Sequence, residues 1–239
     1  MRSKIYLFGD SITESSFSDG GWGSSLANHF ARTLDVVLRG YSGYNTRWAL
    51  RVVEKVFPGA EDAKGQSTAA VTVFFGANDA CLPDRCSSFQ HVPLLEYKSN
   101  LGSLVSFFKG RWPKALILLI TPPPVDEDAR LQFPYVENSS NLPERTNDAV
   151  GEYAKACVEA AKEHSCPVVD LWSKMQEHSD WRKAYLSDGL HLTPAGNKVV
   201  FEEVVKKLCE NGVSLETLPV DLPLIAEIDD TNPLASFPN

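Results

Sequence analysis

Residues 69–79 read Ala-Ala-Val-Thr-Val-Phe-Phe-Gly-Ala-Asn-Asp, and the architecture of the whole chain can be worked out from this segment. A short, largely apolar run that is rich in β-branched and aromatic residues, and that ends at Gly76, is typical of a strand buried on both faces. Such strands belong to parallel sheets, and in open α/β sheets ligands bind beyond the carboxyl ends of the strands. The side chain of Asn78 is therefore expected at a ligand-binding edge.

A second segment, near the N-terminus, has the same design. Residues 4–11 read Lys-Ile-Tyr-Leu-Phe-Gly-Asp-Ser, so an apolar strand again reaches a glycine and then presents polar side chains, here Asp10 and Ser11. Parallel strands carry their carboxyl ends to one edge of a sheet, so the two segments together predict an active site at that edge.

Strands and helices are predicted to alternate along the chain. The predicted strands are residues 4–8, 34–39, 69–75, 115–121 and 166–171. Helical spacing of apolar residues predicts the main helices at residues 24–33, 46–57, 95–110, 144–164 and 194–210.

Five strands joined through helices imply right-handed crossovers and one doubly wound sheet. We expect an α/β protein with a flavodoxin-like fold, a three-layer α/β/α sandwich whose five-stranded parallel sheet has the order 2-1-3-4-5. That order makes the first and third strands neighbours, so Ser11 and Asn78 would face each other across one crevice.

The chain is expected to divide into one main domain, residues 1–212, and a C-terminal tail, residues 213–239, that is acidic and rich in proline. The tail is predicted to lie on the body, to hang free or to pack on a second subunit, which would make the protein a homo-oligomer. Residues 80–94 and 125–143 lack a clear period and are predicted as irregular segments beside the site. Five aromatic residues are candidates for lining an apolar pocket there: Phe17, Trp22, Phe89, Phe133 and Tyr135.

Composition excludes several classes of function. The 239 residues include 23 Lys and Arg against 31 Asp and Glu, a formal charge of −8, which disfavours binding to nucleic acid or to an anionic membrane. No apolar run approaches the ~20 residues of a membrane span, and no secretory signal is recognised at the N-terminus. The odd number of cysteines, five, favours reduced thiols and a cytoplasmic location. Cys81 and Cys86 lack the further Cys or His that a zinc site requires, so no metal is predicted.

Three residues have the chemistry of a nucleophilic hydrolase. The hydroxyl of Ser11 is a weak nucleophile and needs a base that a third group holds in place. His191 follows Asp188 by three residues in the segment Ser-Asp-Gly-Leu-His, directly before a predicted helix start at Thr193-Pro194. Such a turn can bring the carboxylate to Nδ1 of the imidazole and leave Nε2 free to accept the proton of Ser11.

An oxyanion formed by attack of Ser11 also needs hydrogen-bond donors. The backbone N–H of Ser11, the backbone N–H of Gly43 and the side-chain amide of Asn78 would lie at the tips of the first, second and third strands. Each of these residues also has an ordinary interpretation: a serine after a strand often caps a helix, and Asp-x-x-His or Gly-Ala-Asn-Asp often forms a surface turn. Their joint occurrence at neighbouring strand ends favours catalysis.

Four of these segments, in this order, resemble the SGNH hydrolases, the GDSL esterase/lipase family. Gly9-Asp10-Ser11-Ile12 is similar to the family's nucleophile block, Gly43 to its glycine block, Gly76-Ala77-Asn78-Asp79 to its asparagine block and Asp188-Gly189-Leu190-His191 to its acid–base block. The resemblance extends from residue 4 to about residue 212, and Ile12 stands where the family's name has leucine. Within the family, the opening Gly-Asp-Ser-Ile-Thr and the segment Arg-Gly-Tyr-Ser-Gly-Tyr-Asn-Thr resemble the isoamyl acetate-hydrolysing esterases, and the Pro-rich ending resembles plant members.

The resemblance implies a serine esterase that cleaves short-chain acyl esters, such as acetates, through an acyl-enzyme and without a cofactor. Ser11, His191 and Asp188 would be its catalytic residues, and Ser11, Gly43 and Asn78 its oxyanion hole. A carbohydrate O-deacetylase with the same catalytic residues is one alternative, and a catalytically silent binding protein is another. The Gly-x-Ser-x-Gly elbow, the P-loop and the dinucleotide fingerprint do not occur in the sequence.

Overall fold

The computed structural model describes residues 2–57, 59, 67–134 and 136–237, and a parallel sheet lies at its centre. The five strands are β1 (Ser3–Gly9), β2 (Leu34–Gly40), β3 (Thr68–Phe74), β4 (Leu116–Ile120) and β5 (Val168–Val169). They pair in the order β2-β1-β3-β4-β5, and every pairing is parallel. The predicted fold and strand order are therefore confirmed.

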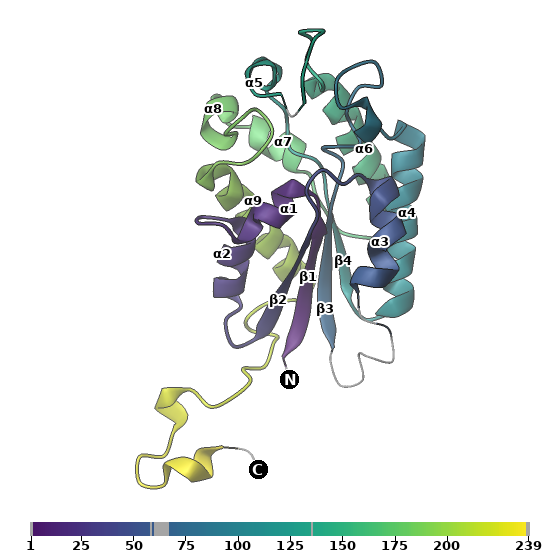
Figure 1. Ribbon diagram of the computed structural model, residues 1–239. Coiled ribbons are helices and arrows are strands. Elements are labelled where there is room, and N and C mark those ends of the chain that lie inside the picture. Colours follow the sequence, from purple (N-terminus) through teal and green to yellow (C-terminus); the bar gives the residue numbers. More distant parts are fainter. Residues whose placement is uncertain (1, 58, 60–66, 135, 238–239) are drawn as a thin grey trace.

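Helices cover both faces of this sheet. The α-helices are α1 (Ser11–Glu14), α2 (Trp22–His29), α3 (Thr46–Val56), α4 (Leu94–Arg111), α5 (Glu127–Gln132), α6 (Asn147–Glu163), α7 (Leu171–Gln176), α8 (Trp181–Tyr185) and α9 (Pro194–Glu210). Helices α2 and α9 pack against one face, and α3, α4 and α6 pack against the other (Figure 1). None of the helices in the described ranges is both long enough and apolar enough to cross a membrane.

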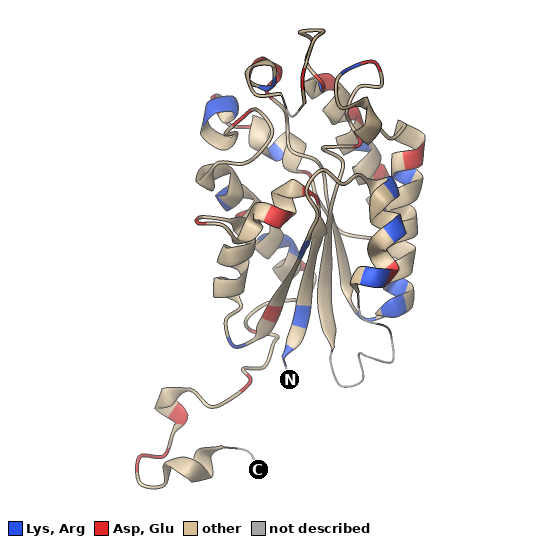
Figure 2. Cartoon of the chain, in the orientation of Figure 1, with Lys and Arg blue, Asp and Glu red and all other residues tan. Residues whose placement is uncertain are grey.

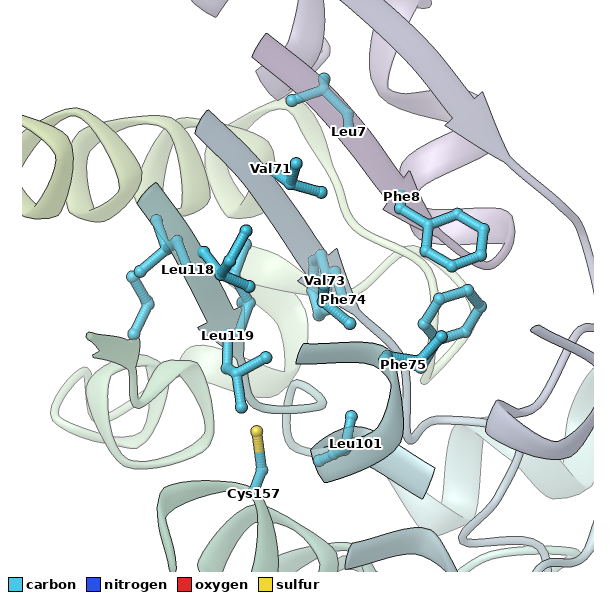
Figure 3. Close-up of a cluster of buried hydrophobic side chains, with 14 of the residues drawn as sticks. Leu7, Phe8, Val71, Val73, Phe74, Phe75, Leu101, Leu118, Leu119 and Cys157 are labelled. Carbon is cyan, nitrogen blue, oxygen red and sulfur yellow. The ribbon is translucent and has the colours of Figure 1, made fainter. Parts of the chain in front are cut away.

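The core is built on the two strands that carry the quoted segments. Leu7 and Phe8 of β1 and Val71 and Val73 of β3 are fully buried, and Figure 3 shows the Phe8 ring beside that of Phe75, which directly follows β3. Burial on both faces explains why these strands read as continuous apolar runs rather than as alternating ones.

Several predicted boundaries were wrong for local reasons. The sixth helix, α6, begins at Asn147 rather than at residue 144, because the hydroxyl of Thr146 caps it by accepting from the N–H of Ala149. The fifth strand is shorter than predicted, because Asp170 caps helix α7. The segment 125–143 is not wholly irregular: its first half contains α5, which the side chain of Asp126 caps.

The C-terminal tail leaves the body near Asp221. Arg2 Nε donates to Asp221 Oδ2 at 2.8 Å, and Arg32 Nη2 donates to the carbonyl oxygens of Leu222 and Pro223 at 2.7 and 3.0 Å. Beyond these anchors the chain runs away from the sandwich, with two short 3-10 turns and exposed apolar side chains such as Ile225 (Figure 1). Its charged residues are acidic (Figure 2).

Candidate active site

Ser11 stands at the carboxyl end of β1, as the first residue of helix α1. The preceding residue, Asp10, caps this helix because its Oδ1 accepts from the N–H of Ile12 at 3.0 Å. The cap turns the chain sharply after Gly9, and the hydroxyl of Ser11 faces the loop between α8 and α9, where its Oγ lies 3.0 Å from Nε2 of His191.

His191 is held by Asp188 through two parts of the same turn. Nδ1 of the imidazole lies 2.8 Å from Asp188 Oδ2, while Asp188 Oδ1 accepts from the backbone N–H groups of Leu190 and His191 at 3.0 and 2.8 Å. The carboxylate is thus bound to both the ring and the backbone of the histidine. The structure brings the three predicted catalytic residues into one hydrogen-bonded row.

The charge of Asp188 determines which tautomer of the histidine is favoured. Partial burial acts to raise the pKa of this carboxyl, but the hydrogen bonds from the His191 ring and from the backbone N–H groups outweigh it and hold the pKa well below its usual range. An ionised Asp188 accepts the Nδ1 proton of His191. Nε2 is then the acceptor that faces Ser11 Oγ.

The predicted oxyanion donors gather on the other side of Ser11. Gly43 adopts a positive φ of +77°, in a turn closed by the Tyr44 N–H and the Tyr41 carbonyl, and its own carbonyl accepts from Gln90 Nε2 at 2.9 Å. Asn78, just beyond β3, is almost fully buried. The predicted donors therefore come from the ends of three adjacent strands.

Contacts on both ends of the Asn78 amide fix its orientation. Nδ2 donates to the carbonyl oxygen of Tyr44 at 2.9 Å, and Oδ1 accepts from Gln90 Nε2 at 3.1 Å and from Arg145 Nη2 at 3.2 Å. Oxygen and nitrogen of an amide are nearly equal in shape, so partners of opposite character are what distinguish the two orientations. One N–H of Asn78 remains for a ligand.

All of these groups meet at a cavity of about 270 Å³. Its lining comprises Ser11, Ser42, Gly43, Asn78, Gln90, Arg130, Phe133, Pro134, Arg145, Asp188, Leu190 and His191. Among the described residues, no group of three or more His, Cys, Asp and Glu side chains is arranged to hold a metal ion. The cavity offers a hydroxyl beside an imidazole, with N–H groups opposite, which is the arrangement that acyl transfer requires.

Most of the aromatic residues predicted to line a pocket do not. Phe133 does line the cavity and is 58% exposed at its mouth. Trp22 is buried in the core, where its Nε1 donates to the carbonyl of Ile12, and Phe17 and Phe89 lie outside the cavity lining. Tyr135 lies outside the described residues.

Four polar residues at the site were not predicted from the sequence: Gln90, Arg130, Glu144 and Arg145. They lie in or next to the two segments that were predicted to be irregular, where polar side chains are ordinarily solvated. A sequence feature that could have pointed to these residues is the adjacent charged pair Glu144-Arg145, which lies shortly before the start of α6.

Two further carboxyl groups are buried beneath the site. Asp10 and Asp79 are almost completely buried, and the second oxygen of each, Oδ2, has no hydrogen-bond partner among the described residues. Burial raises the pKa of each group to about 7, although hydrogen bonds from Ile12 to Asp10 and from Thr46 to Asp79 act in the opposite direction. Both carboxyls are therefore protonated in the folded protein at mildly acidic pH.

The chain is an α/β protein with a cavity at the carboxyl edge of its five-stranded parallel sheet. A model of the family described as GDSL-like lipase/acylhydrolase matches residues 5–204. A GDSL esterase/lipase of Arabidopsis thaliana is 67% identical over 237 residues, which cover 99% of this chain and 98% of that protein. The isoamyl acetate-hydrolyzing esterase 1 homolog of Homo sapiens is 43% identical over 238 residues, which cover 98% and 91%. The chain belongs to the GDSL-like lipase/acylhydrolase family and is a carboxylic ester hydrolase.

Solved structures share the fold at lower identity. The lipase/acylhydrolase from Enterococcus faecalis superposes with a TM-score of 0.67 and 24% identity, covering 93% of this chain and 100% of that one. The acetylxylan esterase Axe2 from Geobacillus stearothermophilus superposes with a TM-score of 0.64 and 22% identity, covering 86% and 94%. These likenesses show that the sandwich is common to esterases of quite different sequence.

The raised pKa of Asp79 predicts how the stability depends on pH. An unfolded aspartate titrates near ~3.9 and folded Asp79 near about 7, so the folded state holds the extra proton between these values. The contribution of Asp79 to stability therefore falls as pH rises through this window and levels off above it. Asp79→Asn should make the decline between pH 4 and 7 shallower, by a few kcal/mol at most, in urea unfolding followed by circular dichroism.

Asp230→Asn, in the exposed tail, is the matched control and should leave the decline as it is in the wild type. An Asp79→Asn variant whose stability declines as steeply as that of the wild type would contradict the prediction.

Proposed function

We propose that this esterase cleaves short-chain acyl esters, acetates in particular, through an acyl-enzyme formed on Ser11. The observation that carries the proposal is the continuous row Asp188–His191–Ser11, with distances of 2.8 and 3.0 Å, on the same cavity as the Asn78 amide. The small cavity suits a short acyl group, because pockets for larger ligands usually measure ~300–1,000 Å³. The identity with isoamyl acetate-hydrolyzing esterase 1 homologs, 43% for the human protein, supports acetate as the acid.

In the proposed reaction, Ser11 Oγ attacks the ester carbonyl carbon as His191 Nε2 takes the hydroxyl proton. The carbonyl electrons move to the oxygen, and the N–H groups of Ser11, Gly43 and Asn78 stabilise the resulting negative charge. His191 then gives its proton to the departing alcohol oxygen. Water, deprotonated by the same nitrogen, attacks the acyl-enzyme and releases the acid and free Ser11, while Asp188 stabilises the imidazolium in both steps.

A carbohydrate O-deacetylase is the second candidate, and the polar part of the mixed cavity lining favours it. Ser42 contributes a hydroxyl to this lining, and a hydroxyl of a sugar alcohol group would find a hydrogen-bond partner there. Comparing acetate release from isoamyl acetate with release from acetylated sugars, at matched concentrations, separates the two substrates. A panel of p-nitrophenyl esters of increasing acyl length would define the limit of the acyl pocket.

Two properties outside the site are also proposed, a cytoplasmic location and self-association. A cytoplasmic location is supported by the acidic charge and by five free thiols, all in described segments. Self-association through the tail is supported by its exposed apolar side chains, Leu222, Leu224, Ile225 and Leu234. If the tail joins subunits, deleting residues 213–239 should lower the number of subunits, obtained by dividing the mass from light scattering by the mass of one chain, and an unaltered number contradicts self-association.

Ser11→Ala should lower kcat for p-nitrophenyl acetate by at least about 10³-fold and leave the melting temperature nearly unchanged, because only the nucleophile is lost. A fluorophosphonate should label the wild type at Ser11 and leave the variant unlabelled. Undiminished turnover by the variant would end the proposed mechanism, and an unlabelled, inactive wild type would favour the silent binding protein.

Asn78→Ala should lower kcat by roughly 10²-fold with little change in KM, because the lost donor stabilises charge that develops only in the transition state. Steady-state kinetics with p-nitrophenyl acetate measure both constants. A rise in KM at constant kcat would instead make Asn78 a ground-state binding residue.

A further inference from the structure

Three buried charged residues, two of which line the cavity, form a bridge between the two halves of the site. The side chains of Arg130, Glu144 and Arg145 are 3%, 1% and 2% exposed. One end of the bridge contacts Asp188, and the other end contacts Asn78. No step of the proposed reaction uses these residues.

Arg130 forms the end that holds Asp188. Its Nη1 donates to Asp188 Oδ2 at 3.1 Å and to the Asp188 backbone carbonyl at 3.3 Å. Its Nε and Nη2 donate to Glu144 Oε1 at 3.0 and 2.8 Å. Asp188 Oδ2 is therefore shared between Arg130 and the His191 ring, which constrains the carboxylate from both sides.

Arg145 forms the end that holds Asn78. Its Nη1 pairs with Glu144 Oε1, and its Nε donates to the Ala77 carbonyl at 2.6 Å. Its Nη2 donates to Asn78 Oδ1 and to Gln90 Oε1, both at 3.2 Å. Gln90 in turn donates to Asn78 Oδ1 at 3.1 Å, so Arg145 holds the amide both directly and through Gln90.

We propose that Arg145 is the positioning residue of the oxyanion hole, keeping the Asn78 amide turned with its N–H toward the cavity. This inference rests on the proposed function. A flipped amide would place its NH₂ group against a guanidinium and its oxygen against the Tyr44 carbonyl, and both contacts are repulsive. The adjacent positive charge also polarises the amide and makes its remaining N–H a stronger donor.

The charges of the bridge and of Asp188 sum to zero, which lowers the free-energy cost of burying them. Arg130 and Arg145 carry two positive charges, and Glu144 and Asp188 carry two negative ones. A buried charge without a partner costs several kcal/mol, whereas these four are paired and hydrogen-bonded. The guanidinium of Arg145 directs Nε, Nη1 and Nη2 to protein groups, and Asn78 is the one among them that is assigned to the oxyanion hole, so Arg145 is a positioning residue for Asn78.

The test is a double-mutant cycle between Arg145→Met and Asn78→Ala. Methionine keeps much of the length of the arginine side chain and leaves Glu144 paired with Arg130. In the wild-type background, Arg145→Met should lower kcat for p-nitrophenyl acetate about tenfold, with KM within twofold, because part of one donor's contribution is lost. In the Asn78→Ala background the same change should cost less than twofold, since the group it acts through is gone. Equal losses in both backgrounds would overturn the proposal.

Arg47→Met is the matched control. Arg47 is also held in a bidentate pair, with Glu96 at 2.7 Å through each of two nitrogens, but that pair is exposed. Arg47→Met should leave kcat unchanged.

Arg145→Lys keeps the charge beside Glu144 but not the several directed N–H groups. Its kcat should fall between those of the wild type and Arg145→Met. If Arg145→Met does not fold, Arg145→Lys takes its place in the double-mutant cycle.

Neutron crystal structures of Arg145→Met and Arg145→Lys, which distinguish the nitrogen of an amide from its oxygen, give a readout that needs no catalysis. The Asn78 amide is expected to turn, or to occupy two orientations, once Arg145 no longer faces its oxygen. An amide that keeps its single wild-type orientation in both variants would overturn the proposal. If Ser11→Ala keeps its turnover, the proposed function is refuted. The orientation of the Asn78 amide in the Arg145 variants tests the role of Arg145 separately.

Discussion

The alignment of three neighbouring parallel strands is the constraint on which the rest of the site depends. Gly9 at the end of β1 pairs with Gly40 on β2 and with Phe74 on β3, so the three strands end at one level. At Gly9 the backbone passes so close to its neighbours that a Cβ would lie 2.6 Å from the Phe74 carbonyl oxygen and 2.0 Å from Thr13 Oγ1. A glycine is needed there because no larger residue lets the chain turn within this space. The turn places Ser11 beside groups that follow the other two strands.

Buried polar and charged groups hold the site together, although burying such groups in the protein interior costs free energy. Beneath Ser11, Asp10 and Asp79 are buried with raised pKa values, and behind Asn78 a bridge of paired charges is buried. Each arrangement reduces the stability that an apolar core would provide, because desolvation of charge is costly. In return the loops beyond the strand ends are tied to the sheet through side chains: Asp79 through Thr46, and Arg145 through the Ala77 carbonyl. A hydrolase needs fixed donors where negative charge develops, and fixed polar groups are what these contacts supply.

The family and the cavity limit the chemistry in different ways. The family match and the high identity with curated esterases define a carboxylic ester hydrolase, whereas the shared sandwich of distant esterases defines only the scaffold. The preference among esters is a property of the cavity lining, in which Phe133 and Leu190 are apolar and Ser42 and Gln90 are polar. This mixed lining is why a short acyl ester and an acetylated sugar both remain chemically reasonable substrates.

Local patterns in the sequence were enough to predict the sheet and the polar residues that follow its strands. Apolar runs ended by glycine located β1 and β3, and the polar residues directly after them, Ser11 and Asn78, lie where the strand order requires. The turn from Asp188 to His191 could also be predicted from local sequence, because its hydrogen bonds span only three residues. The strand order followed from rules of connection that apply to any alternating α/β chain.

Only the tertiary structure could bring Arg145 to Asn78, 67 residues away along the chain, or Arg130 to Asp188, 58 residues away. A single charged residue has no periodic signal that distinguishes a solvated side chain from a buried one, so no role was predicted for Arg130, in a segment expected to be irregular, or for Arg145, within a predicted helix. The start of α6 was also misplaced, because the Thr146 hydroxyl caps the helix and leaves Glu144 and Arg145 in the segment before it. Strand ends follow from short-range sterics and apolar burial, whereas buried ion pairs depend on which distant segments fold against each other.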